Sequence, residues 1–295
     1  MIKSIQINRT SKKIEKLKAV VTYEDESTHL HGRDKNEATN RYILGRLFIH
    51  PVLKKINKIE FKPGINLIFA RNGTGKSTIL DILSYCLHAR QNYSSHITRK
   101  SCDDLFEKLA NWPILLSDYD NPKSNIPDLL KIEHDGQALH YFDPEHLVGL
   151  QHAGREFDFD FDMKVGMKSK VGSSGEQILM RLENFFNNTE TEIKYKQTLE
   201  TCRNSWKGEI KEPVISKLLT PSIDPGQITY ILDEPTRSLD SYHEAAFWDL
   251  IDKSRDKQII IVTHSPYALF LKDVNYIELT PGYIEQCKKW FNEKI

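Results

Sequence analysis

A glycine-rich segment of the chain combines residue types that bind phosphate groups. It reads Ala70-Arg71-Asn72-Gly73-Thr74-Gly75-Lys76-Ser77-Thr78. The pattern G-x-x-x-x-G-K-[ST] is matched except at its first position, which is Ala70. Gly73 and Gly75 let the backbone curl so that its amides point inward at an anion. Lys76 would bridge the β- and γ-phosphates of a nucleotide, and the Ser77 hydroxyl would take a place on Mg²⁺.

The elements expected on either side of this segment favour phosphate binding. Residues 65–69 form an apolar run, typical of a buried strand, that ends directly before the loop. Residues 76–89 place apolar side chains on one helical face, and the positive end of such a helix attracts an anion. The alternative is a chance Gly-Lys-Ser turn that caps a helix. We predict that the nucleotide is held by Asn72, Gly73, Thr74, Gly75, Lys76, Ser77 and Thr78.

Two adjacent carboxylates follow a second apolar run. Residues 228–232 have the pattern of a buried strand, and Asp233, Glu234 and Pro235 come directly after it. Open parallel sheets bind ligands at the carboxyl edge of their strands. At that edge Asp233 would hold Mg²⁺ through the metal's water shell, and Glu234 would be the general base or the residue that polarises water for attack on the γ-phosphate. The alternative is a solvated turn that ends the strand.

Together these motifs resemble the ABC superfamily of ATPases, in the form found in its SMC/RecF-like members. The matching segments are Asp233-Glu234-Pro235-Thr236 (Walker B), Ser238-Leu239-Asp240 (D-loop), Thr263-His264-Ser265-Pro266 (switch histidine), Gly172-Ser173-Ser174-Gly175-Glu176 (signature) and Lys62-Pro63-Gly64-Ile65-Asn66. The resemblance implies an α/β P-loop NTPase fold. Its core would be an ABC-like mixed sheet flanked by helices, and a helical or mixed lobe would carry the signature motif.

The resemblance also implies roles for single residues, with ATP and Mg²⁺ bound between two copies of the chain. His264 would contact the γ-phosphate while Glu234 orients water; a packed or surface histidine is the alternative. Ser173 and Gly175 would contact the γ-phosphate bound by the other copy, where the alternative is a plain helix cap. Asp240 would help to build the dimer interface.

The order of the expected elements divides the chain into a core and a lobe. The strand, helix and strand expected between residues 228 and 262 predict a parallel βαβ unit. We therefore expect a nucleotide-binding core at 1–92 and 214–295 and an inserted lobe at 93–213. The resemblance also implies a glutamine that couples this lobe to Mg²⁺; its identity stays open between Gln137 and Gln151, with the acid Glu145 as a substitute for it.

The composition limits the class of protein. Hydrophobic residues make up 39% of the 295, enough for a large core, and the net charge of zero argues against a strongly basic protein that coats DNA. The four cysteines are scattered without a C-x-x-C pair, so neither a zinc site nor a disulfide framework is indicated. No apolar run is long enough to span a bilayer. We expect a soluble, cytoplasmic protein without membrane insertion.

Two further patterns have ordinary interpretations. Phenylalanine and aspartate alternate over residues 157–162, which predicts a strand with a solvated acidic face; a metal or nuclease site is the alternative. Lysines at 164, 168 and 170 are expected in a solvated loop, and contact with nucleic acid is the alternative.

The leading hypothesis is an ATP-hydrolysing homodimer that acts as a switch. The resemblance to SMC/RecF-like proteins favours a role in DNA maintenance or in defence against foreign DNA, with nucleic acid and a nuclease or toxin as partners. The first alternative is the ATPase subunit of a membrane transporter. The second is an ATP-dependent protein-interaction switch that regulates a toxin without DNA contact.

Overall fold

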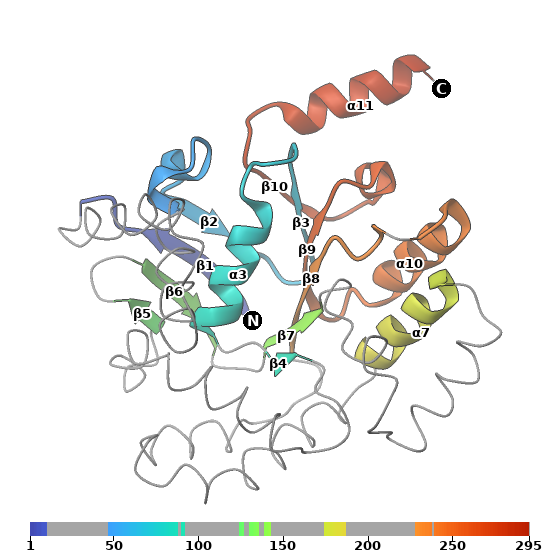
Figure 1. Ribbon diagram of the computed structural model, residues 1–295, viewed down its shortest axis with the longest axis horizontal. Helices are drawn as coiled ribbons and strands as arrows, with labels where there is room; N and C mark the ends of the chain where they lie inside the picture. The colour runs from blue at the N-terminus through green and yellow to red at the C-terminus, as the bar shows by residue number, and fades with distance from the viewer. Residues whose placement is uncertain are drawn as a thin grey trace, which may run out of the picture.

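The structure is a computed structural model, and the strands among its described residues form two sheets with helices between and outside them (Figure 1). It describes residues 1–10, 47–87, 90–91, 124–126, 130–135, 139–142, 174–186, 228–237 and 239–294. The strand expected at 157–162 and the lysines at 164, 168 and 170 lie outside these residues. In the part of the chain described, no helix is both long and apolar enough to cross a bilayer.

The larger sheet is parallel in all its recorded pairings and has the strand order β10-β3-β9-β8-β7-β4. Its strands are β3 (Ile65–Phe69), β4 (Arg90–Gln91), β7 (Leu139–Phe142), β8 (Thr229–Asp233), β9 (Gln258–Thr263) and β10 (Asn275–Glu278). β9 therefore lies between the strand before the glycine-rich loop and the strand before the acids. Every residue of β3 and β9 is buried, which explains their unbroken apolar runs.

The smaller sheet is antiparallel, with the order β2-β1-β6-β5. It contains β1 (Ile2–Ile7), β2 (Lys58–Glu60), β5 (Ser124–Ile126) and β6 (Leu130–His134). Among the described residues, the strands of the expected mixed-sheet core are divided by direction between this antiparallel sheet and the parallel one. In β2 and β6 buried and more exposed residues alternate, as in a sheet with one solvated face.

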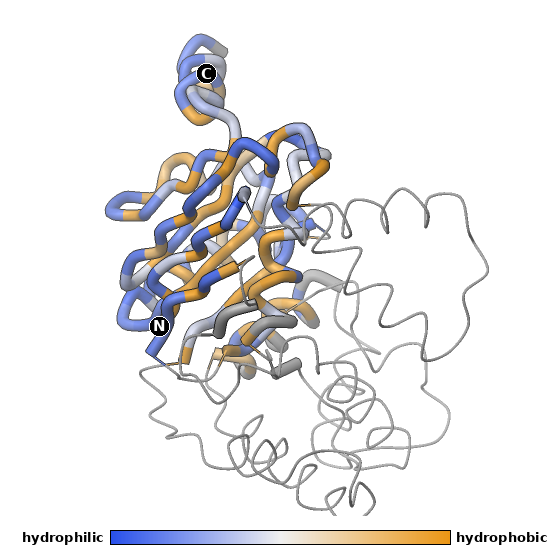
Figure 2. The backbone as a smooth tube through the Cα atoms, turned by 90° about the vertical axis from the view of Figure 1, so that its left-hand side faces the viewer, coloured by the Kyte–Doolittle hydropathy of each residue, from blue (hydrophilic) through white to orange (hydrophobic). Residues whose placement is uncertain are grey.

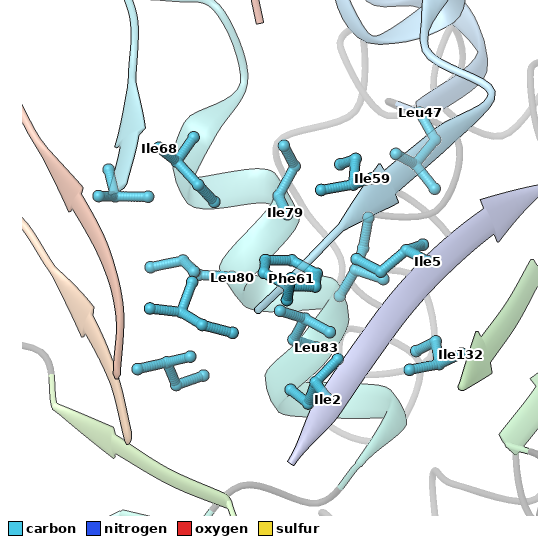
Figure 3. Close-up of a cluster of buried hydrophobic side chains, with 14 of the residues drawn as sticks. Ile2, Ile5, Leu47, Ile59, Phe61, Ile68, Ile79, Leu80, Leu83 and Ile132 are labelled. Carbon is cyan, nitrogen blue, oxygen red and sulfur yellow. The ribbon is translucent and has the colours of Figure 1, made fainter. Parts of the chain in front are cut away.

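Helices cover both faces of the parallel sheet, because both faces are apolar. Helix α3 (Lys76–Cys86) lies between the two sheets, where Leu80 and Leu83 are completely buried (Figure 3). Helices α7 (Ser174–Phe186) and α10 (Ser241–Lys253) cover the opposite face of the parallel sheet (Figure 1). Figure 2 shows hydrophobic residues concentrated along the central strands, as this layering requires. The described residues also form η1 (Leu53–Lys55), η3 (Pro266–Phe270) and α11 (Tyr283–Lys294).

A buried glutamine joins the two sheets at the start of β9. The Gln258 amide nitrogen donates to the carbonyls of Ile2 and Lys62, at 2.7 and 3.0 Å. Its side-chain oxygen accepts from the Ile2 amide at 2.7 Å and from the Thr229 hydroxyl at 2.8 Å. All the hydrogen-bonding groups of the Gln258 amide are therefore used, which offsets the cost of burying it. This residue fixes β1 and β8 relative to β9.

The expected elements around the loop are confirmed, with small shifts at their ends. β3 has the predicted bounds, and the parallel βαβ unit consists of β8, α10 and β9. α3 ends at Cys86 and not at 89, and the signature segment leads into α7, which begins at Ser174. The division into core and lobe stays a prediction. Within the range expected for the lobe, β7 pairs with β8 in the parallel sheet.

Candidate functional site

The glycine-rich loop after β3 is curled at its two central glycines. Gly73 and Gly75 have φ angles of +69° and +86°, in the left-handed region that favours glycine. Gly75 is also the N-cap of α3, so the loop leads directly into a helix N-terminus. Ala70 is completely buried and is not among the described residues with positive φ. Alanine therefore replaces the first glycine of the pattern without backbone strain.

The Lys76 side chain lies inside this curl. Its Nζ donates to the carbonyls of Ala70 and Arg71, both at 3.1 Å, and lies 2.8 Å from Nε2 of His264. The side chain is buried, with Lys76 only 5% exposed. Burial lowers the pKa of the Lys76 ammonium group, while the charges of Glu234 and Asp233 oppose that shift. A cation held in this way can interact strongly with an anionic ligand, because little water screens it.

His264 connects the loop to the acid pair. Its Nε2 lies 3.0 Å from Oε1 of Glu234 as well as 2.8 Å from Nζ of Lys76. Burial lowers the pKa of the imidazole, the Lys76 charge lowers it further, and Glu234 opposes both effects. The lowered pKa favours the neutral ring, in which a single nitrogen cannot accept from Lys76 and donate to Glu234 at once. Such a ring can change its partner when a phosphate arrives.

Glu234 is held in an unusual backbone conformation. Its φ of +43° is one of two positive values outside glycine among the described residues. Its amide donates to the Val262 carbonyl at 2.9 Å, which extends the pairing of β8 with β9. Strained conformations of this kind persist where the surrounding structure fixes them, and they cluster at functional sites. The strain supports a functional role for the Glu234 carboxylate.

Ser77 and Asp233 provide oxygen atoms suited to a small divalent cation. The Ser77 hydroxyl donates to Oδ1 of Asp233 at 3.2 Å. Mg²⁺ prefers hard oxygen ligands such as a hydroxyl and a carboxylate, and it usually keeps several of its water molecules, through which a carboxylate can also hold it. The two residues therefore fit the metal that the sequence assigned to them. The described residues contain no group of three or more His, Cys, Asp or Glu suited to a metal.

Hydrogen bonds after β9 fix the segment that carries His264. The Ser265 hydroxyl oxygen accepts from Nε1 of Trp248 at 3.1 Å and from the Tyr267 amide at 3.2 Å. The Ser265 amide donates to the Thr263 hydroxyl oxygen at 2.9 Å. Because Trp248 belongs to α10, the helix after the acids holds the segment that carries the histidine.

The structure brings together only part of the predicted site. The glycine-rich loop, the acid pair and His264 converge as expected. Asp240 is the N-cap of α10, and its side chain accepts from the His243 amide at 3.0 Å. Gly175 lies in the first turn of α7. The remaining predicted residues lie outside the described part of the chain: Ser173, Ser238, Gln137, Gln151 and Glu145.

Contacts behind the loop were missed by the sequence analysis. Nε2 of His50 lies 2.8 Å from the Gly73 carbonyl oxygen. Leu53 lies so close to Gly75 that an ideal Cβ there would be 2.5 Å from Leu53 Cδ1. The Arg71 guanidinium lies over the Tyr283 ring at 5.4 Å. None of these contacts has a spacing signal, because each joins segments that are separate in the sequence.

The two glycines of the loop provide a matched pair of substitutions. Gly73→Ala should cost about 1 kcal/mol of unfolding free energy, because alanine resists positive φ and a Cβ there has open space. Gly75→Ala should cost about 2–4 kcal/mol, because the same strain is added to the overlap with Leu53. Urea denaturation of the two variants measures the difference. Equal losses would show that Leu53 does not restrict position 75.

Comparison with known proteins identifies one match. A family model described as an AAA domain (AAA_23) matches residues 48–218, more than half of the chain. The match contains the glycine-rich loop and α7, and it ends before β8. No curated protein and no solved structure matches the chain significantly.

Proposed function

The chain belongs to the AAA_23 family of P-loop NTPases, and on that premise we propose that it is an ABC-type ATPase that works as a nucleotide-driven homodimer. One observation carries the proposal: Lys76, His264 and Glu234 form a contiguous cluster next to the glycine-rich loop. A cation, a neutral ring and a carboxylate in this order can bind a triphosphate and direct water at its terminal phosphorus.

The reaction uses these side chains in distinct roles. Water attacks the γ-phosphorus, its proton passes to the Glu234 carboxylate, and the bond to the β–γ bridging oxygen breaks to give ADP and phosphate. Lys76 stabilises the charge on the phosphate oxygens, and neutral His264 donates a hydrogen bond to the γ-phosphate. Mg²⁺, held by Ser77 and Asp233, would supply further charge neutralisation when bound.

Dimerisation is supported by the resemblance of the signature segment and the D-loop to those of ABC ATPases. In this arrangement Ser173 and Gly175 of one copy contact the γ-phosphate bound by the other. α7 packs through Phe185 against Phe142 and Tyr230, so the helix after the signature segment is attached rigidly to the parallel sheet. A helix fixed in this way can transmit closure of the dimer to the rest of the chain.

Removal of Mg²⁺ tests the metal assignment. Excess EDTA should abolish ATP turnover, and Ser77→Ala should raise the Mg²⁺ concentration for half-maximal turnover by about three- to tenfold, because one oxygen ligand is lost. Steady-state phosphate release across a Mg²⁺ titration gives both values. Thr74→Ser is the control, because it keeps the hydroxyl that donates to the Arg71 carbonyl at 2.8 Å. An unchanged Mg²⁺ requirement in Ser77→Ala would contradict the assignment.

We further propose that the switch acts in DNA maintenance or in defence against foreign DNA, together with a nuclease or toxin partner. Support comes from the SMC/RecF-like character of the family. Duplex or single-stranded DNA should then raise ATP turnover at low salt, and the effect should decrease as salt is added. Absence of both DNA binding and stimulation would favour a switch that regulates a protein partner without DNA.

A further inference from the structure

The segment that precedes β2 is clamped to the end of β1 by one arginine. The Arg9 guanidinium donates to the carbonyl oxygens of Leu47 at 2.7 Å, Leu53 at 2.6 Å and Ile56 at 2.5 Å. It also lies over the Phe48 ring, 5.2 Å from its centroid. Three charge-assisted hydrogen bonds to one short segment fix its path. The segment is therefore a rigid support and not a loose connection.

This support touches the glycine-rich loop at two points. Leu53, which is 1% exposed, packs against Gly75 at the start of α3. His50 reaches the Gly73 carbonyl oxygen through Nε2 at 2.8 Å. Because a carbonyl only accepts, Nε2 must carry the proton and donate. Nδ1 is then the acceptor, and the amides of Val52 and Leu53 approach it at 3.3 and 3.4 Å.

Anchoring the Gly73 carbonyl also orients the next amide. A trans peptide unit is planar, so its C=O and N–H point in opposite directions, and no cis peptide occurs among the described residues. The Gly73 carbonyl points at His50, on the support side of the loop. The Thr74 N–H must therefore point away from the support. Glycine at position 73, with φ of +69°, would otherwise let this peptide unit rotate easily. The hydrogen bond to His50 therefore restricts a rotation that the backbone allows.

We propose that His50 is a positioning residue for phosphate binding: it holds the Gly73–Thr74 peptide so that the Thr74 amide faces the nucleotide phosphates. The inference rests on nucleotide binding at the glycine-rich loop, which is part of the proposed function. A loop with preset amides binds an anion without a further ordering cost. The competing explanation is that His50 only caps the backbone of η1 through Nδ1.

Two substitutions separate these roles. His50→Gln places an amide nitrogen near the position of Nε2, so it keeps a donor for the Gly73 carbonyl. His50→Asn places its oxygen near the position of Nδ1, so it keeps an acceptor for the amides of Val52 and Leu53, as in an Asx-turn, but cannot reach Gly73. His50→Ala removes both groups. Ile49→Ala is the control, because this neighbouring side chain is 39% exposed.

The readouts are the Kd for ADP and for ATP with Mg²⁺, measured by calorimetry, and the Tm of each nucleotide-free protein. His50→Asn and His50→Ala should bind about three- to tenfold more weakly than wild type, whereas His50→Gln and Ile49→Ala should stay within about twofold. The Tm values of the nucleotide-free proteins should rank these two variants in the opposite way, with His50→Asn more stable than His50→Gln. The KM for ATP should rise with the Kd, while kcat changes little.

Each other pattern would overturn the inference. If affinity decreases in parallel with Tm, so that His50→Asn binds better than His50→Gln, His50 is a structural cap only. An unchanged Kd in His50→Ala would remove the role altogether. Failure of the wild-type protein to bind nucleotide would reject the proposed function first and this inference with it, so the wild-type measurement distinguishes the two failures.

Discussion

Lys76→Ala should bind nucleotide far more weakly than the wild-type protein. Charge-assisted hydrogen bonds contribute about 1.5–3 kcal/mol each, so loss of contacts to two phosphate groups corresponds to an increase in Kd of about 100- to 10,000-fold. The effect should be near the upper end, because Lys76 is only 5% exposed and few water molecules can replace its ammonium group. Calorimetry with ATP and Mg²⁺ gives the Kd directly.

A second readout tests the site without nucleotide. The pKa of His264 is lowered first by burial and then by the Lys76 charge. Removal of that charge should therefore raise the pKa of the imidazole toward its ordinary value, which an NMR titration measures. Lys62→Ala is the control, because Lys62 is exposed. Its hydrogen bonds to Asn66 are made by backbone atoms, which the substitution keeps. Tight ATP binding by Lys76→Ala would overturn the phosphate-binding assignment.

The parallel sheet was predictable because its strands carry strong local signals. β3 and β9 are short apolar runs next to turn residues, and each is buried throughout. The end of α3 was less predictable, since Leu87 continues the apolar stripe but is the C-cap. The separation of the strands into two sheets depends on pairings such as β1 with β6. That pairing joins residues more than 120 positions apart, which no local pattern records.

The chemistry of the site was more predictable than the structure that holds it. Lys76, Glu234 and His264 each follow a recognisable strand, and the strand order brings their side chains into contact. The supports show no such pattern. His50 and Gln258 act largely through hydrogen bonds to backbone atoms of distant segments, and any residue type can provide a backbone carbonyl or amide. Such contacts become visible only when the tertiary structure is known.

Glu234→Gln should bind ATP normally, hydrolyse it about 100- to 10,000-fold more slowly and accumulate as a dimer. The amide has the size of the carboxylate and keeps the backbone at φ of +43°, but it cannot accept the proton of the attacking water. The γ-phosphate therefore persists, and with it the contacts that close the dimer. Light scattering with ATP and Mg²⁺ should give twice the mass of the nucleotide-free protein, and single-turnover kinetics give the rate.

Two control variants test whether this result depends on the Glu234 carboxylate and on bound nucleotide. Glu133→Gln makes the same chemical change at an exposed position on β6 and should hydrolyse ATP at the wild-type rate. The double variant with Lys76→Ala should stay monomeric, because it does not retain nucleotide. A monomeric Glu234→Gln protein at saturating ATP would contradict the dimer, even if its turnover is lost. If Glu234→Gln instead hydrolysed ATP at the wild-type rate, Glu234 would not be the base. Opening of the dimer would then have to be controlled from elsewhere in the chain.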